Sequence, residues 1–431
     1  METREKLKKM LTEWSEFDPP ELYRRDFNYS LLESGEVLSI IGARRAGKTY
    51  LCYQIINELK KKYPPENIAY INMEDERLHP INGDELTLLL EVYEELFSVD
   101  RSKKFFLVID EIQNVNNWSK WARRITEQNK NLKLIITGSS SKLLSSEIAT
   151  ELRGRTTSFA VYPLSFAEYL GAVNFKTENK NILYSNERVI IKKQFNNYLK
   201  AGGFPATLRG GEPKEILKEY FRVMFYRDLI ERYKIKNIRL FEDYLTLLID
   251  QIASSFSISS TANKLMTFGY SFSKNTLSNF SKYAEDAFLV FEVRKYSHKL
   301  KEQLRAPKKI YAIDHGLVQA VRFSFSEDYG RLLENIVFTA LKRRGVGIFY
   351  HQGKKECDFL VSEGGRVSQA IQVTKSMANA ETKKREVDGL FEAMEFHKLK
   401  EGLILTEDEN DKIKIGKSSI EILPIWYWLI N

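Results

Sequence analysis

The stretch GARRAGKT, residues 42–49, constrains this chain more than any other, because it follows the apolar run VLSIIG and precedes the apolar segment YLCYQIINEL. Gly42 and Gly47 let the backbone approach a ligand closely and adopt dihedral angles that a Cβ would obstruct. With Lys48 and Thr49 after them, this spacing is typical of a loop whose backbone N–H groups wrap a triphosphate at a helix N-terminus. A strand, a phosphate-binding loop and a helix are therefore expected in this order.

The loop predicts a site for ATP and Mg²⁺. Lys48 is expected to bridge the β- and γ-phosphates, and the Thr49 hydroxyl is expected to bind Mg²⁺. The residues expected around the nucleotide are Gly42, Ala43, Arg44, Arg45, Ala46, Gly47, Lys48, Thr49 and Tyr50. Arg44 and Arg45 extend the positive charge of the loop, although surface exposure explains them equally well.

Two adjacent acids follow a second apolar run, FFLVIDEIQ, which ends in Asp110 and Glu111. An acid at a strand end can hold Mg²⁺ through water, and a second acid can polarise the water that attacks the γ-phosphate. An acidic pair alone is a weak signal, because acids also cap helices. Downstream of the phosphate-binding loop, it predicts Asp110 as the metal residue and Glu111 as a catalytic one.

Further candidates lie beyond the run LKLIITGSSS. Thr137, Ser139 and Ser140 place polar side chains where they could sense the γ-phosphate, and a helix N-cap is an equally good interpretation. Arg153 or Arg155 in LRGRTTSF could act as an arginine finger in a neighbouring subunit, because a guanidinium suits spread transition-state charge. The alternative is a salt-bridged anchor of the loop. A finger acting between subunits would require an oligomer.

The apolar pattern predicts an α/β fold of several domains. Residues 36–41, 67–73, 105–110 and 132–137 are short apolar runs separated by helix-like segments, which is typical of a parallel, doubly wound sheet. At 431 residues the chain exceeds what one core usually serves. We expect an ATPase core at 1–165, a helical lid at 166–240, a winged helix-turn-helix at 241–322 and an α/β unit at 323–431.

The predicted winged helix carries the candidates for DNA contact. Its second helix opens at Ser273, and the run RKYSHKLKEQLRAPKK at 294–309 holds seven Lys or Arg against the single acid Glu302. Such a wing could follow phosphates while the helix enters a major groove. The candidate residues are Lys274, Asn275, Arg294, Lys295, Lys299, Lys301, Arg305, Lys308 and Lys309. The alternative is a packing module with a solvated hairpin.

Seven segments occur along the chain in this order: GARRAGKT, YINMEDERL, VIDEIQNVNNW, TGSSSKLLSSEIATELRGR, YPLSFAEYL, GGFP and YRDLIERY. Together they resemble the archaeal and bacterial AAA-type ATPase family whose C-terminal half is a domain of unknown function. The resemblance covers nearly the whole chain. It implies a P-loop ATPase core of AAA type, a helical and winged-helix middle and, in many members, a restriction-endonuclease-like C-terminal α/β domain.

A nuclease of that fold needs an acid on its first helix, an acid on its second strand, and an acid and a lysine two residues apart on the third. Glu334 and Asp358 fit the first two positions, but the third strand has Gln372 and Thr374, with Lys375 one place late. A neutral amide ligates Mg²⁺ more weakly than a carboxylate, and the missing lysine removes a stabilising charge. The sequence therefore favours a degenerate domain that does not cleave.

Composition sets the remaining expectations. Lys and Arg outnumber Asp and Glu by 66 to 58, which favours polyanionic partners but also fits a solvated basic surface. The charged N-terminal segment is unlike a signal peptide, and the apolar C-terminal segment is too short to span a bilayer, so we expect a cytoplasmic protein. The leading hypothesis is a Mg²⁺-dependent ATPase coupled to DNA or nucleoprotein binding. The alternatives are a slow nucleotide switch that binds protein partners, and an ATP-dependent nuclease.

Overall fold

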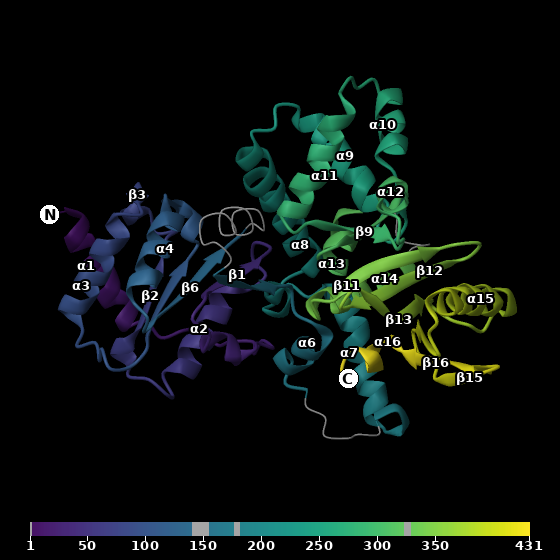
Figure 1. The fold of residues 1–431 in the computed structure, drawn as a ribbon, viewed down its shortest axis with the longest axis horizontal. Helices are drawn as coiled ribbons and strands as arrows, with labels where there is room; N and C mark the ends of the chain where they lie inside the picture. The colour runs from purple at the N-terminus through teal and green to yellow at the C-terminus, as the bar shows by residue number, and fades with distance from the viewer. Residues whose placement is uncertain (1, 140–154, 176–181, 323–328) are drawn as a thin grey trace. The chain divides into compact units, whose positions relative to one another are not determined.

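A computed structural model describes residues 2–139, 155–175, 182–322 and 329–431 (Figure 1). The chain forms two compact units, Met1–Tyr162 and Pro163–Asn431. The first unit ends within the boundary expected for the ATPase core. The expected division of the remaining residues into lid, winged helix and α/β unit stays a prediction.

A five-stranded parallel sheet forms the centre of the first unit. Its order is β2-β4-β6-β1-β7, so that β6 lies between β1 and β4. The strands are β1 Val37–Gly42, β2 Ile68–Asn72, β4 Phe105–Asp110, β6 Leu132–Gly138 and β7 Thr156–Val161. The first four match the apolar runs in the sequence, which confirms the parallel α/β core. The fifth was not expected, because β7 is a partly exposed edge strand whose apolar run is only three residues long.

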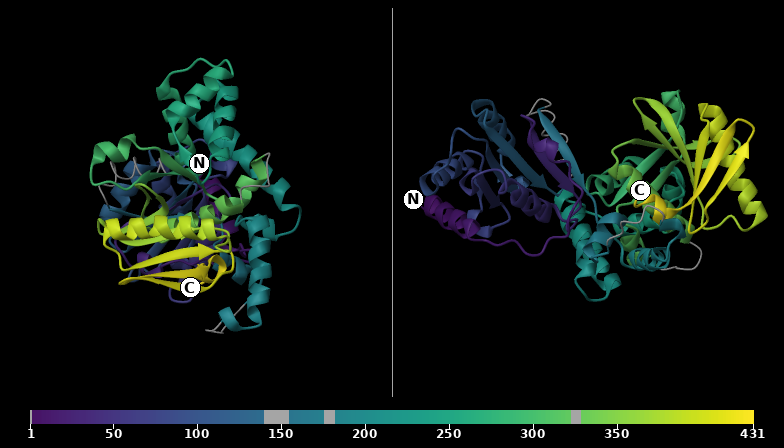
Figure 2. Two further views of the ribbon diagram at one scale, coloured as in Figure 1. Left: turned by 90° about the vertical axis from the view of Figure 1, so that its right-hand side faces the viewer. Right: turned by 90° about the horizontal axis from the view of Figure 1, so that it is seen from below.

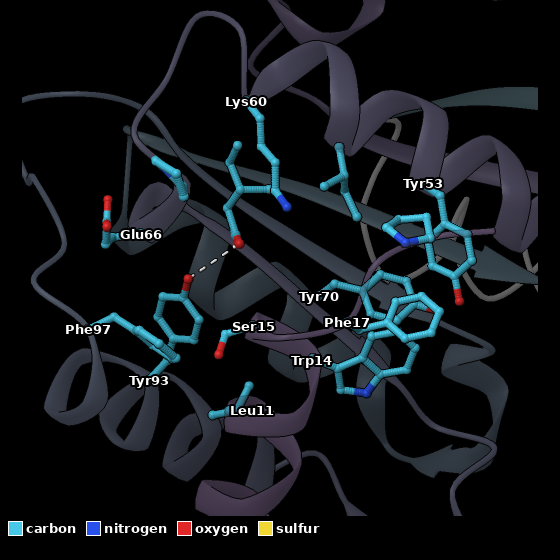
Figure 3. A pocket seen from close by; sticks show the side chains of 14 residues that line it. Leu11, Trp14, Ser15, Phe17, Tyr53, Lys60, Glu66, Tyr70, Tyr93 and Phe97 are labelled. Atoms are coloured by element: carbon cyan, nitrogen blue, oxygen red, sulfur yellow. Dashed lines mark hydrogen bonds between the residues drawn. The ribbon is translucent and has the colours of Figure 1, made fainter. Parts of the chain in front are cut away.

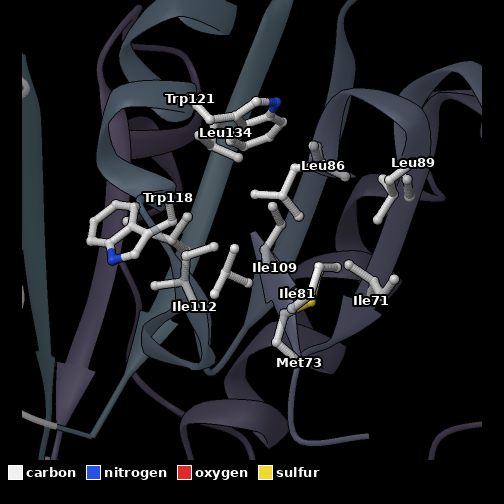
Figure 4. Close-up of a cluster of buried hydrophobic side chains, with 14 of the residues drawn as sticks. Ile71, Met73, Ile81, Leu86, Leu89, Ile109, Ile112, Trp118, Trp121 and Leu134 are labelled. Atoms are coloured by element: carbon white, nitrogen blue, oxygen red, sulfur yellow. The ribbon is translucent and has the colours of Figure 1, made fainter. Parts of the chain in front are cut away.

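Helices cover this sheet on both sides. They are α1 Glu2–Ser15, α2 Lys48–Leu59, α3 Glu85–Leu96 and α4 Trp118–Gln128, and the short strands β3 Ile81–Asn82 and β5 Val115–Asn116 pair beside them. Helices α1, α3 and α4 bury Leu11, Leu89 and Trp121 against one face of the sheet, in the core drawn in Figure 4. This packing holds the C-terminal ends of the parallel strands, where the candidate acids lie, at one edge of the sheet.

Helices dominate the first part of the second unit. They are α6 Phe166–Ala172, α7 Glu187–Ala201, α8 Pro213–Val223, a π-helical segment Met224–Glu231, and α9 Ile238–Asp250. A capping box of Ser165 and Glu168 starts α6. Between α7 and α8, the Gly203 N–H donates to the Asp314 carboxylate at 2.7 Å, and this carboxylate also caps α13 (His315–Val321). The GGFP turn is thereby fixed against the start of α13.

A nine-stranded mixed sheet runs through the rest of the second unit in the order β15-β16-β14-β13-β12-β11-β9-β10-β8. Its strands are β8 Ser255–Phe256, β9 Val290–Lys295, β10 Lys308–Ala312, β11 Gly347–Gln352, β12 Glu356–Glu363, β13 Arg366–Val373, β14 Glu401–Thr406, β15 Asp411–Ile415 and β16 Ser418–Pro424. The parallel pairing of β9 with β11 joins the ranges expected for the winged helix and the α/β unit into one sheet.

Besides α13, further helices accompany these strands. They are α10 Ile258–Thr267, α11 Lys274–Asp286, α12 Leu300–Arg305, α14 Tyr329–Arg343, α15 Ala380–His397 and α16 Ile425–Trp428. Helix α15 packs along β12, β13 and β14, and Figure 2 shows it beside the C-terminal strands. Within the described ranges, no helix is both long enough and apolar enough to cross a membrane.

Candidate nucleotide site

The loop between β1 and α2 has the backbone that a phosphate cradle needs. Gly42 and Gly47 have φ angles of 151° and 104°, and Arg45 also lies at positive φ. A Cβ on Gly42 would collide with the Val161 carbonyl on β7, so the glycine also permits close packing of the loop against the sheet. Gly47 caps α2 without any side-chain hydrogen bond, which leaves its first N–H groups to a ligand.

Lys48 is turned back onto its own loop. Its side chain is nearly buried, and Nζ donates to the Gly42 and Ala43 carbonyls at 3.3 Å each. The same Nζ lies 3.7 Å from Glu111 Oε1 at the end of β4. The phosphate-binding loop and the acidic strand end therefore meet directly, as the sequence predicted from two separate motifs.

Asp110 lies at the end of β4 and is fully buried. Its Oδ2 accepts the Thr49 hydroxyl at 2.6 Å and the Tyr70 hydroxyl at 2.9 Å, and its Oδ1 accepts the Thr137 hydroxyl. Burial raises the pKa of Asp110, and so does the neighbouring charge of Glu111, whereas the three hydroxyl hydrogen bonds lower it. Paired oxygen donors of this kind, a hydroxyl and a carboxylate, suit Mg²⁺.

Glu111 leaves the strand in a left-handed conformation, with φ 53° and ψ 48°. Its N–H donates to the Thr137 hydroxyl at 2.9 Å, and its carboxylate accepts a hydrogen bond from the Gln113 side chain. A non-glycine residue in this conformation is a feature that often marks functional sites. The turn directs the Glu111 carboxylate toward Lys48 instead of along the strand.

At the end of β6, Thr137 is the residue that contacts both acids at the end of β4. Because β6 lies between β1 and β4, Thr137 bridges Asp110 and the Glu111 backbone at the point where the loop and the acids meet. Ser139 follows β6 and is buried. Ser140 lies outside the described residues. The sensing role expected for Ser139 stays a prediction.

The candidate arginines are placed differently from one another. Arg44 lies 3.4 Å from Glu74, and Arg155 has an exposed side chain that pairs with Glu127 at 2.9 Å. This pair fits the alternative of a salt-bridged anchor for the segment before β7. Arg153 lies outside the described residues. The role of Arg153 or Arg155 as an arginine finger stays a prediction.

Two residues near the site were not found from the sequence. Arg25, which is buried, donates through Nη1 to the Ala46 carbonyl of the loop at 2.9 Å, and its backbone N–H donates to Gln54 at 2.7 Å. Tyr70 reaches Asp110 from the edge strand β2. Neither belongs to a motif, and only the sheet order brings Tyr70 beside β4.

Tyr70 also lines a pocket of about 240 Å³ in the first unit, drawn in Figure 3. The Trp14 ring of α1 lies 4.3 Å from the Tyr70 ring, centroid to centroid, and Tyr53 lies 5.4 Å away. On the other side of the pocket the Tyr93 hydroxyl donates to the Ile68 carbonyl. The aromatic packing fixes the Tyr70 ring, and with it the hydroxyl that binds Asp110.

In the second unit, the predicted DNA-contact residues fall into two groups. Asn275 on α11 is exposed, as are Asn279 and Lys282, and their i, i+4, i+7 spacing places them on one face, whereas nothing is described of the Lys274 side chain. Arg294, Lys299, Lys301 and Arg305 are exposed and Lys295 is half-buried. Lys308 pairs with Glu292 on β9.

Lys309 differs from the expected surface position, because it points from β10 into the buried region where the nuclease-like candidates meet. Its Nζ lies 2.9 Å from Asp358 on β12, 3.2 Å from Glu334 on α14 and 2.7 Å from Glu356. It is 2% exposed. A buried lysine that pairs with three carboxylates cannot follow DNA phosphates, so the expected surface position of Lys309 was wrong.

The structure brings Glu334, Asp358 and Gln372 together, but it also fills their bonding positions. Gln372 accepts the Asp358 N–H at 3.1 Å and donates to Glu386 at 2.6 Å. Lys375 points elsewhere, with its Nζ over the Tyr329 ring. Across the described residues, no group of three His, Cys, Asp or Glu side chains is arranged to hold a metal ion.

Comparisons with known proteins show which families and proteins this chain is similar to. The model of the family described as AAA domain matches residues 34–170, and that of a domain of unknown function (DUF8612) matches residues 192–328. An uncharacterized protein of Methanocaldococcus jannaschii is 39% identical over 94% of this chain and 91% of its own length. An uncharacterized protein of Haemophilus influenzae is 28% identical over 91% of this chain and 94% of its own length.

Among solved structures, the Walker-type ATPase of Pyrococcus abyssi is similar at 16% identity, with 75% of this chain and 96% of that chain covered and a TM-score of 0.43. The near full-length match to the Methanocaldococcus jannaschii protein, the AAA domain and the P-loop geometry lead to one conclusion. The chain belongs to a family of AAA-type P-loop ATPases whose C-terminal part is a domain of unknown function.

Proposed function

We propose that this chain hydrolyses ATP in a Mg²⁺-dependent reaction at the junction of the phosphate-binding loop and β4. One observation carries the proposal: Lys48 faces Glu111 while Thr49 binds Asp110, so that both residues of the loop end meet both acids of the strand end. The backbone of the loop, with its glycines at positive φ and an uncapped helix N-terminus, supports phosphate binding.

The roles follow from these contacts. Lys48 would exchange the Gly42 and Ala43 carbonyls for β- and γ-phosphate oxygens, because an ammonium gains more from an anion than from a carbonyl. Thr49 and Asp110 would hold Mg²⁺, which when bound neutralises charge that develops on the phosphates. Glu111, released from Lys48, would orient the attacking water and accept its proton.

The test compares ATP turnover of the wild type with Glu111→Gln and Lys48→Ala. Loss of a general base lowers turnover by about 100-fold or more while nucleotide binding remains, whereas loss of Lys48 weakens binding itself. Glu33→Gln, which removes a surface acid paired with Lys104, is the control and should leave both unchanged. Full turnover in Glu111→Gln would remove this residue from the mechanism.

We further propose that nucleotide state is coupled to DNA or nucleoprotein binding through the second unit. The element order α9, β8, α10, α11, β9, β10, with β8, β10 and β9 paired antiparallel, supports the winged-helix interpretation. The exposed polar face of α11 supports its role as the recognition helix. Mobility shifts at rising salt test the coupling, because phosphate contacts weaken steeply with salt.

A second candidate function is a slow nucleotide switch that binds protein partners. It is favoured by Phe268, which is 62% exposed and lines a groove with Arg239, Asp243 and Tyr270. Complex formation that is insensitive to salt, without any DNA shift, would support this alternative. An arginine finger that acts between the subunits of an oligomer would be compatible with both proposed functions.

The nuclease alternative receives less support. Lys309 neutralises the carboxylates that would hold a metal ion, and Gln372 is bonded to Asp358 and Glu386. We therefore propose a domain that does not cleave. Metal-dependent DNA cleavage that disappears in Asp358→Ala would reverse this conclusion.

A further inference from the structure

The tip of the β9–β10 hairpin is a short helix, α12, that buries none of its residues. Leu300 and Leu304 are 64% and 55% exposed. They are four residues apart and lie side by side on one face of the helix. Two neighbouring leucines exposed to water do not stabilise a hairpin that only connects two strands. We therefore expect a binding partner to cover this face.

The charges around the leucines indicate what that occupant is. Lys301 and Arg305 are also four residues apart, and their exposed side chains form a second stripe beside the leucines. Arg294 adds further exposed positive charge. The acid within the tip, Glu302, is bonded to Ser297 and Lys299, and these contacts hold the pKa of its carboxyl below the ordinary range. The tip therefore presents an apolar pair flanked by cations.

We propose that α12 is a wedge for duplex DNA, with Leu300 and Leu304 inserted between base steps from the minor groove and Lys301 and Arg305 on the flanking phosphates. Apolar wedges of this kind unstack a step and kink the duplex, and the energy for this comes from buried apolar surface and phosphate contacts. The inference rests on the DNA binding proposed above and adds how the wing engages the duplex.

The base of the hairpin is built to support such a wedge. Lys309, which begins the buried part of β10, is held by carboxylates from β12 and α14, and the Tyr350 hydroxyl of β11 donates to the Pro307 carbonyl. Strand β9 pairs with β10 on one side and β11 on the other. These contacts hold the base of the hairpin rigidly in the sheet, so that α12 can press on a duplex without the hairpin bending.

The experiment uses the full chain and end-labelled duplexes of mixed sequence that contain 2-aminopurine, whose fluorescence rises when its neighbours unstack. Wild-type protein should bind and raise the fluorescence at specific steps. Leu300→Ala/Leu304→Ala should bind about tenfold more weakly and abolish the rise. Lys301→Gln/Arg305→Gln should keep the leucines and lower the slope of log affinity against log salt by about two.

The control is Val189→Ala/Ile190→Ala, which removes an equally exposed apolar pair from α7 and should change neither signal. Binding without any rise in fluorescence would overturn the wedge and leave the proposed DNA binding intact. No binding by the wild type would overturn both. Capture of phosphatidylglycerol vesicles that depends on the leucines, without DNA unstacking, would assign the tip to a membrane surface and overturn the proposal.

Discussion

The Asp110 carboxylate collects hydroxyl groups from three different elements: Thr49 of α2, Tyr70 of β2 and Thr137 of β6. A buried carboxylate is costly unless its oxygens are bonded, so these hydroxyls offset part of the cost of burying it. The sequence predicted Asp110 and Thr49 from two motifs. Tyr70 could not be predicted, because a tyrosine in an apolar run reads as core.

Tyr70→Phe removes one of these donors without a change in ring packing. We expect the free energy of unfolding of the first unit to fall by about 1–3 kcal/mol, because a buried carboxyl group loses a hydrogen-bond partner. ATP turnover should fall as well, because Asp110 is less well positioned. Denaturant titration followed by tryptophan fluorescence measures the first effect, since Trp14 packs on Tyr70.

Tyr93→Phe is the matched control for this change. Its hydroxyl lines the same pocket and donates to the Ile68 carbonyl at 3.3 Å (Figure 3), a different acceptor from the Asp110 carboxylate that Tyr70 binds. It should leave turnover unchanged. Equal loss of turnover in both variants would show that the hydroxyl contact to Asp110 has no special role.

Glu334 makes the second unit sensitive to pH. Burial and, to a lesser degree, the Asp358 charge raise the pKa of Glu334 to about 7, against the lowering effects of Lys309 and the Tyr311 hydroxyl. Glu334 therefore takes up a proton on folding when the pH lies between its ordinary pKa of 4.5 and its raised pKa of about 7. Its favourable contribution is therefore complete at low pH and is lost as the pH rises through 7.

We expect the wild type to lose stability on the order of 3 kcal/mol between pH 5 and pH 8 from this residue alone. Glu334→Gln, which stays neutral, should flatten this part of the curve and be more stable than the wild type at pH 8. Thermal unfolding of both proteins at a series of pH values between 5 and 8 measures this difference in stability. Parallel curves for the two proteins would mean that Glu334 is charged throughout.

At the scale of elements, the GGFP turn depends on backbone contact that only glycine allows. Gly202 has a φ of 71°, and a Cβ there would strike the Asp314 carboxylate that holds the Gly203 N–H and caps α13. In the sequence, GGFP stands out only as one of the segments that carry the family resemblance. Its partner could not be foreseen, because Asp314 lies more than a hundred residues away in a different segment.

Gly202→Ala should destabilise the second unit by about 3 kcal/mol or more, from left-handed strain together with the clash. Gly210→Ala is the control, since Gly210 has a φ of 97° but open space around it. That change should cost only about 1 kcal/mol, the strain alone. Hydrogen exchange of the α13 amides distinguishes the two variants, because only Gly202→Ala should disturb Asp314, which caps α13. Equal protection of α13 in both variants would contradict this role of the Asp314 contact.

Elements with a strong apolar period were predicted well, and those at sheet edges were not. The apolar runs at 36–41, 67–73, 105–110 and 132–137 lie within one residue of the observed bounds of β1, β2, β4 and β6. Strands β7 and β15 lie at sheet edges, are only partly buried and lack a long continuous apolar run. Edge strands bury one face at most, so packing leaves little trace in their sequence.

At the scale of the whole molecule, local motifs were more informative than overall charge. The loop and the acids at β4 were predicted from spacing, because phosphate and metal binding impose fixed residue types over short distances. The basic run at 294–309 was treated as one surface, yet the structure divides it between an exposed tip and the buried Lys309. Counting charges cannot tell which side of a strand a lysine leaves.

The nine-stranded sheet has a consequence for how this chain could have been assembled in evolution. Strands β8–β10 and β11–β16 share one ladder, and Lys309 of the first group neutralises carboxylates of the second. Neither part could be exchanged for an unrelated module without exposing a strand edge and stranding a buried charge. The two parts are therefore expected to be inherited together, and to be acquired or lost by a lineage as a single piece.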